Sequence, residues 1–431
     1  MNLKQKVIRR RSILDTIGLV GLLGLVVINA FHFNLLNAYL YYREFFSGFF
    51  LVLIARYAMI SFFGPKQTEI RVNHLLFYLL LFPLLLYIWS FIDFNVSLYG
   101  VDELGRVSAH INDVSLSLYV LRNALLYLPM VVYIYLRGLN LDEIRIIAFV
   151  VSIVVPFSIM SYMQSVSIYG QDLTLGMIGE LGGQGIAYNS YVPYLTFGVL
   201  CAIYLLYSQV HPIGEMILIV CISYAVIFIF LSTSRQSTLF VLISFIAFVL
   251  ITGKGLIDYK KWFISGAALV AIFILFDHFT DGYVLADKII DRYSGVDDFL
   301  DSGSRGNKVL DGLSMLSPFE LLIGAGLTSV IVSGPHNDYV RWTQRVGVPL
   351  MIFGFYPFFF AFKHGFRLAR LNSESNTLFL FITLAVGYTL FHSLFGYPRE
   401  DANQAVVSYL GLALWFGAYS EGLLNLNRQE K

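Results

Sequence analysis

The side chain best suited to proton transfer near neutral pH is His336, in the sequence Gly334-Pro335-His336-Asn337-Asp338. An imidazole titrates close to neutrality, which suits a general base. Gly334 and Pro335 favour a fixed turn before the ring, and Asn337 and Asp338 carry polar groups that can orient it. The alternative is a loop histidine bonded to nearby backbone, and spacing alone does not separate the two. Because this candidate proton-transfer group lies just outside the hydrocarbon, we expect an enzyme in preference to a passive channel.

A second polar segment, from Ser232 to Ser237, joins two long apolar runs and contains Arg235. A tight polar turn accounts for the serines. It does not account for an arginine in a short loop that the topology below places on the outer side, where basic residues are disfavoured. A guanidinium forms paired hydrogen bonds with phosphate oxygens. We therefore expect Arg235, with Ser234 beside it, to bind a diphosphate.

Five further arginines have two interpretations each. Arg305 follows Ser-Gly-Ser and either binds substrate or is a solvated charge. Arg122 and Arg56 fall inside predicted membrane spans, where a charge needs a partner, a cavity or the interface. Arg122 either contacts substrate or extends outward to water, and Arg56 is either functional or part of a structural ion pair. Arg341 and Arg345 share one face of a helix and either flank a phosphate or pair with loop aspartates.

Composition places the chain among polytopic membrane proteins. Hydrophobic residues make up 57% and charged residues 13%, and the mean hydropathy is +0.71. The formal net charge of +1 argues against a nucleic-acid partner, because neutralising phosphates requires a clear basic excess. Cys201 and Cys221 both lie in apolar runs, where we expect them to act as small hydrophobic residues.

Runs of about twenty apolar residues, the length that crosses a bilayer, predict about twelve helices. The basic segment before Ile13 resembles a secretory signal, but the following run is long and lacks a small-x-small cleavage site, so we expect an uncleaved first span. The predicted spans lie near residues 13–32, 45–63, 74–93, 117–136, 146–164, 187–207, 215–232, 237–252, 262–279, 346–363, 377–394 and 403–422.

Basic residues alternate between loops as the positive-inside rule requires when the amino terminus is cytoplasmic. The short outer loops hold only Arg43, Arg106, Arg235 and Arg399. The inner loops and termini hold Lys66, Arg71, Arg137, Arg145, Lys254, Lys260, Lys261, Lys363, Arg367, Arg370, Arg428 and Lys431. Both termini are therefore expected in the cytoplasm, and one long loop, about 280–345, is expected in the periplasm.

This long loop is too short for an independent core of ordinary stability. Its mixed charges are typical of short helices that lie across the mouth of a helix bundle, and apolar spacing between Asn307 and Leu316 predicts one such helix. We therefore expect a single transmembrane domain, 1–431, with the candidate catalytic histidine in the 280–345 loop.

Several motifs are absent from the sequence. It contains no P-loop, GxGxxG, HExxH or paired CxxC pattern, so nucleotide-driven pumping and zinc chemistry have no support. The first outer loop, from Phe33 to Glu44, has no Asp-x-Asp pair, which weakens the case for a metal-dependent lipid-linked glycosyltransferase. We expect neither a cofactor nor a metal.

Three motifs together resemble the O-antigen polymerase and O-antigen ligase (Wzy/WaaL-type) superfamily of membrane glycosyltransferases. They are the Ser234-Arg235 turn, the Gly324-Ala325-Gly326 segment, and His336-Asn337-Asp338-Tyr339 followed by Gly347. The resemblance covers roughly residues 187–365. The aromatic residue often seen shortly after the arginine that matches Arg305 is missing here.

The resemblance implies a GT-C-like helical fold and an inverting, metal-independent sugar transfer on the periplasmic face of a bacterial inner membrane. The donor would be an undecaprenyl-diphosphate-linked glycan. His336 would be the general base, and Arg235 would hold the donor diphosphate. We expect Ser234, Arg305, Asn337 and Arg122 to contribute to substrate binding. Membrane lipid and a chain-length regulator protein are further expected partners.

A polymerase is preferred over a ligase because of the aromatic-rich composition, with 38 Phe and 28 Tyr, although either activity fits. A polymerase transfers the glycan to another lipid-linked repeat, whereas a ligase transfers it to lipid A core. A flippase or other transporter is a further alternative, but such carriers usually have two similar halves with the longest loop between them. Here the long loop follows the ninth span. A structural assembly protein would not need the outward histidine and arginines.

Overall fold

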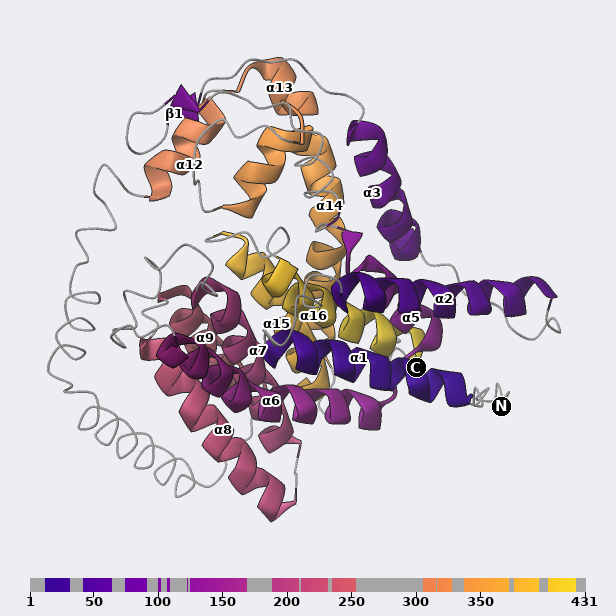
Figure 1. The fold of residues 1–431 in the computed structure, drawn as a ribbon, viewed down its shortest axis with the longest axis vertical. Coiled ribbons are helices and arrows are strands. Elements are labelled where there is room, and N and C mark those ends of the chain that lie inside the picture. The colour runs from indigo at the N-terminus through magenta and orange to yellow at the C-terminus, as the bar shows by residue number, and fades with distance from the viewer. Residues whose placement is uncertain are drawn as a thin grey trace, which may run out of the picture.

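Figure 1 shows the computed structural model of the chain. The structure describes residues 12–31, 42–63, 74–90, 100–101, 107–108, 122, 125–168, 188–208, 211–231, 235–252, 305–314, 316–327, 337–371, 376–394 and 402–423. His336 and Ser234 lie outside these residues, as does the span predicted near 262–279. Arg235 and Arg305 are placed by their backbone only.

Thirteen helices and a two-residue antiparallel strand pair make up the described part. The amino-terminal half contains α1 (Ile13–Phe31), α2 (Tyr42–Phe63), α3 (His74–Ser90), β1 (Gly100–Val101), β2 (Val107–Ser108), α5 (Leu128–Arg137), α6 (Leu141–Ile168), α7 (Tyr188–Tyr207) and α8 (Pro212–Leu231). The second half contains α9 (Arg235–Thr252), α12 (Arg305–Ser314), α13 (Pro318–Ile323), α14 (Asp338–Leu371), α15 (Asn376–His392) and α16 (Ala402–Ser420).

The expected all-helical fold class is confirmed for the described residues. Each predicted span except the one near 262–279 overlaps a described helix, although α5 covers only the second half of the span predicted at 117–136. The helix predicted between Asn307 and Leu316 is present as α12. Within the described part, Pro212–Ile229 and Asp338–Arg370 are long and apolar enough to cross a membrane. The count of about twelve spans stays a prediction.

The centre of the bundle consists of α7, α15 and α16, which pack against one another and are surrounded by the other helices. In α15 every residue other than Thr377 and Phe391 is buried. Helices that are apolar on all sides are typical of the interior of a large bundle. Aromatic stacking joins α7 to α15 in this centre. The ring centroids of Tyr204 and Phe381 lie 4.3 Å apart, and the ring planes are inclined by 10°.

The outward faces of the peripheral helices are apolar as well. On α9 the exposed large side chains recur at helical spacing, and they are Leu239, Leu242, Ile243, Ile246 and Leu250. The exposed face of α8 has the same character, with Ile213, Met216, Ile217 and Val220. A helix on the surface of a water-soluble domain normally turns polar residues outward. These faces therefore match an apolar surrounding better than water.

Helix pairing defines two ends of the bundle. At the end we call the network end, Leu139 after α5 donates its N–H to the carbonyl of Gly417 in the last turn of α16, at 3.0 Å. At the end we call the site end, the Asp338 N–H at the start of α14 donates to the carbonyl of Ser393 just after α15, at 2.8 Å. The site end is the one that the predicted topology places in the periplasm.

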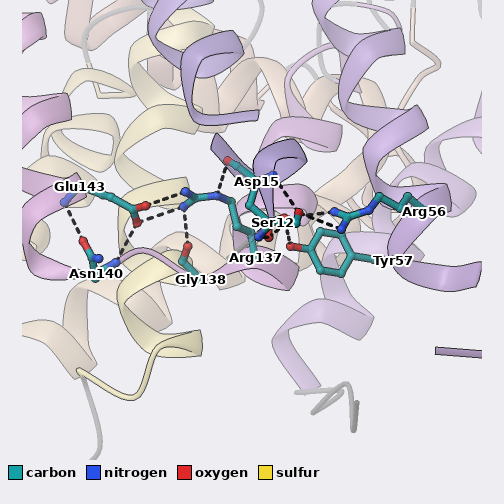
Figure 2. Close-up of polar contacts among 8 residues, drawn as sticks. All are labelled: Ser12, Asp15, Arg56, Tyr57, Arg137, Gly138, Asn140 and Glu143. Carbon is teal, nitrogen blue, oxygen red and sulfur yellow. Dashed lines mark hydrogen bonds and ion pairs between the residues drawn. The ribbon is translucent and has the colours of Figure 1, made fainter. Parts of the chain in front are cut away.

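A polar network at the network end joins α1 to α2 (Figure 2). Ser12 and Asp15 cap the start of α1: the Asp15 N–H donates to Ser12 Oγ at 3.3 Å, and the Ser12 N–H donates to Asp15 Oδ2 at 2.8 Å. From α2, Tyr57 donates its hydroxyl to Asp15 Oδ1 at 2.6 Å, and Arg56 Nη1 lies 3.2 Å from the same oxygen. Arg56 therefore forms an ion pair with Asp15. This agrees with the interpretation of Arg56 as part of a structural ion pair.

The same network continues to α5 and α6 through Arg137 (Figure 2). Its guanidinium contacts both carboxylate oxygens of Glu143, at 2.6 and 3.1 Å. It also donates to the backbone carbonyls of Asp15 and Gly138, each at 2.9 Å. Glu143 and Asn140 cap α6 reciprocally, at 2.8 and 3.1 Å. Paired bonds to a buried carboxylate satisfy a charge that burial would otherwise penalise.

Candidate functional site

The first turn of α9 lies against the end of α15. Arg235 is the first residue of α9. Two residues later, Ser237 is fully buried. The ring of Phe240, one turn further along α9, lies 4.8 Å from the ring of Tyr388 on α15. The backbone at the candidate diphosphate ligand is therefore held against a buried part of the bundle.

The start of α14 lies against the same end of α15. Asn337 caps α14 because its Oδ1 accepts the N–H of Val340 at 3.1 Å. Its Nδ2 also donates to the carbonyl of Leu394 at 3.2 Å. Both contacts are structural, and the expected role of Asn337 in substrate binding stays a prediction. His336 directly precedes this cap in the sequence.

Asp338 strengthens the junction between α14 and α15. It is fully buried, and its carboxylate lies 3.5 Å from the hydroxyl of Ser393. Tyr339 adds a third contact by donating its hydroxyl to the carbonyl of Leu390 at 2.9 Å. The Leu390 carbonyl lies in the last turn of α15, where carbonyls lack intrahelical donors.

A buried polar cluster lies at the junction of these helices. Tyr388 and His392, one turn apart on α15, are each 3% exposed, and the Tyr388 hydroxyl is 3.2 Å from His392 Nδ1. The ring of Tyr388 also packs on Phe240 of α9, so the pair lies where α9 meets α15.

This cluster was missed in the sequence, although a signal for it was present. His392 lies inside the predicted span at 377–394. The reasoning that singled out Arg56 and Arg122, that an ionisable residue within a span needs a partner or a function, applies equally to His392.

Two of the glycine motifs that carry the family resemblance are in direct contact. Gly347 has φ 77° and ψ 165°, which breaks the helical path of α14 into 338–346 and 348–371. A Cβ at Gly347 would lie 2.3 Å from the Leu322 carbonyl oxygen, and a Cβ at Gly324 would lie 2.3 Å from that of Arg345. We call this contact between the backbones around Gly324 and Gly347 the glycine crossing. Only residues without a Cβ allow the two backbones to come so close.

Hydrogen bonds across this crossing involve carbonyls next to the break. Pro349 has no N–H to donate to the carbonyl of Arg345. The N–H of Gly326 donates to the Arg345 carbonyl at 3.2 Å, and that of Ala325 donates to the Gln344 carbonyl at 2.7 Å. The crossing thereby attaches α13 to the point at which the long part of α14 begins.

The other loop helix, α12, packs on the first part of α14, and both lie with α13 at the top of Figure 1. Gln344 Nε2 donates to the carbonyl of Gly312 in α12 at 3.1 Å. Arg305 is the first residue of α12. Arg345 is 2% exposed, so of the two arginines on this face only Arg341 has appreciable solvent exposure.

Arg122 forms an ion pair with Glu44 in the first turn of α2, and both side chains are partly exposed. This contact links Arg122 to α2, and its expected substrate contact stays a prediction. Among the described residues, no group of three or more His, Cys, Asp or Glu side chains is arranged to hold a metal ion. Cys201 and Cys221 are buried thiols, as expected.

No family model matches the chain, and no similar sequence is found among curated proteins. The resemblance to the O-antigen polymerase and ligase superfamily therefore remains a prediction. It depends on short motifs, on their order, and on the side of the membrane to which they are assigned.

Proposed function

We propose that this chain is a membrane glycosyltransferase that polymerises O-antigen or a related surface polysaccharide. In this proposal it transfers an undecaprenyl-diphosphate-linked glycan to a hydroxyl of another lipid-linked repeat, with inversion and without a metal. The chain crosses the bacterial inner membrane about twelve times, has both termini in the cytoplasm, and acts on the periplasmic face.

The membrane assignment is supported by the outward faces of the peripheral helices. Between Leu239 and Leu250, the large exposed side chains of α9 are all apolar. Exposing such stripes to water would be unfavourable by about 25 cal/mol per Å² of apolar surface. Hydrocarbon removes this cost, and α8, with 20 residues, is about 30 Å long, which matches the hydrocarbon thickness.

The observation that carries the proposal is the meeting of the starts of α9 and α14 at the end of α15. Arg235 and Asn337 are 102 positions apart in the sequence. Phe240 near the start of α9 packs on the ring of Tyr388, and Asn337 bonds to Leu394, so both segments contact one short stretch of α15 and the residues after it. A reaction that needs both a phosphate ligand and a base requires such proximity.

The chemistry assigned to these segments suits glycosyl transfer from a diphosphate. The incoming hydroxyl loses a proton as it attacks the anomeric carbon, and His336 would accept it. The departing diphosphate gains negative charge, which Arg235 would stabilise through paired hydrogen bonds. Neither step requires a bound metal.

Two substitutions test the assignment in membranes supplied with the lipid-linked donor. Arg235→Ala should abolish polymer formation, and Arg235→Lys should restore only part of it because an ammonium lacks the paired geometry. His336→Gln should lower the rate on the order of a hundred to ten thousand fold, the usual contribution of a general base. His211, an exposed histidine before α8, provides the matched control His211→Gln. Full-length polymer at the wild-type rate from well-expressed Arg235→Ala or His336→Gln would refute the assignment.

The glycan profile of a deletion strain separates a polymerase from a ligase. Loss of a polymerase leaves one repeat on the lipid A core, whereas loss of a ligase leaves none. A core without repeats would replace the polymerase proposal with the ligase alternative. An unchanged profile would reject both.

A further inference from the structure

The last turn of α15 contacts both segments that carry the proposed chemistry. Tyr388 packs on α9 and bonds to His392 one turn later, and Ser393, the next residue, contacts α14. We propose that Tyr388, His392 and Ser393 are positioning residues that fix the start of α9 relative to the start of α14. This role rests on the proposed function, because it matters only if those two segments act on the same substrate.

On the α9 side, the contact is made by Tyr388. Its ring packs against Phe240 with centroids 4.8 Å apart, and Ser237, one turn before Phe240, is fully buried. Residues two positions apart have Cα atoms at most about 7 Å apart. Anchoring Ser237 therefore restricts the position of Arg235.

On the α14 side, the contact is made by Ser393. Its carbonyl accepts the Asp338 N–H at 2.8 Å, and its hydroxyl lies 3.5 Å from the Asp338 carboxylate. Asp338 is two positions after His336 in the sequence, so the same limit of chain length applies. One turn of α15 thus restricts both segments.

His392 holds this turn in one arrangement. Its Nδ1 lies 3.2 Å from the Tyr388 hydroxyl. Both residues are only 3% exposed. Buried polar groups that satisfy one another lock their rotamers, because breaking one bond leaves an uncompensated polar group in apolar surroundings. Misplacing a reacting group by about 1 Å can lower a rate by about a hundredfold.

The test combines hydrogen exchange with kinetics on the purified full-length protein. Tyr388→Phe removes the hydroxyl that bonds to His392, and we expect amides 237–240 to exchange at least about tenfold faster, because the ring that packs on Phe240 is no longer held in one position. The kcat for donor consumption should fall at least about tenfold, with the KM for the donor changed less than about twofold, because the groups that bind the donor remain. Tyr207→Phe is the matched control, since Tyr207 is 1% exposed and packs on Phe248, far along α9 from Ser237.

A second pair of variants covers a failure of Tyr388→Phe to fold. His392→Leu should reproduce the kinetic loss, and His392→Gln should restore most of kcat because an amide can still bond to Tyr388. Unchanged exchange at the start of α9 in Tyr388→Phe, or faster exchange with an unchanged kcat, would overturn the positioning role, as would equal kcat values for His392→Leu and His392→Gln. If Arg235→Ala and His336→Gln were fully active, the proposed function would fail instead, whatever the exchange data showed.

Discussion

The glycine crossing between α13 and α14 predicts that Gly347→Ala is strongly destabilising. At φ 77° and ψ 165°, a residue with a Cβ is strained by about 1–3 kcal/mol. The new Cβ would also lie 2.3 Å from the Leu322 carbonyl oxygen and 2.6 Å from its carbon, where carbon–oxygen contacts are normally about 3.3 Å or longer. Both opposing atoms are backbone, so no side-chain rotation relieves the contact. Overpacking adds about 1–3 kcal/mol, for a total of about 2–6 kcal/mol.

The assay is unfolding of the purified protein in mixed micelles, followed by the midpoint of an SDS titration. Gly48→Ala is the matched control, because a Cβ at Gly48 in α2 meets nothing within 4 Å and Ala is favoured over Gly in a helix by about 1 kcal/mol. Gly347→Ala should lower the midpoint, and Gly48→Ala should leave it unchanged or raise it. Equal midpoints for the two variants would refute the reasoning.

The variant on the other side of the contact, Gly324→Ala, provides a second test. A Cβ at Gly324 would lie 2.3 Å from the Arg345 carbonyl oxygen, and φ is 78° there. Either substitution forces the same two backbones apart, so the second should add only its own backbone strain. The double variant should therefore be less destabilised than the sum of the singles. Additivity within about 0.5 kcal/mol would mean that the two glycines act independently.

Two further predictions concern topology and the network end. A cysteine introduced at Ser302 should be labelled by an impermeant thiol reagent from the periplasm. A cysteine at Ser373 should be labelled only after permeabilisation, because the intervening helix places it on the other side of the membrane. Equal labelling of both in intact cells would overturn the topology. Glu143→Gln should reduce stability by about 3 kcal/mol, since breaking a buried pair typically costs about 3–5 kcal/mol while Arg137 retains two carbonyl partners. Asp142→Asn, which alters the exposed pair with Arg145, is the control and should change the unfolding midpoint little.

Helix positions were predictable because each depends on a local property. A run of about twenty apolar residues predicts a helix, and the tenth run was predicted to begin at 346. The structure places the break in α14 at Gly347. The beginning of α9 at Arg235, against a predicted 237, follows equally from the polar turn that precedes it.

The partners of buried polar groups were not predictable, because they are distant in the sequence. Arg56 was recognised as needing a partner, yet Asp15 is 41 positions away and Arg137 reaches Asp15 across 122. No periodicity in a single sequence specifies such pairs. The contact between the segments of Gly324 and Gly347 was unpredictable for the same reason. Both glycines were noticed in the sequence, but only the fold shows that each packs against the backbone next to the other.

The two ends of the bundle are held in different ways, and this difference has consequences for function. At the network end, charged groups form paired bonds that are costly to break, so substitutions there should reduce the amount of folded protein. At the site end, groups such as the Tyr388 hydroxyl and the His392 ring make single bonds, each worth about 1 kcal/mol to stability. Removing one of these bonds should leave the fold intact while loosening the segments beside Arg235 and Asp338. Activity per folded molecule should therefore depend on the site end, and abundance on the network end.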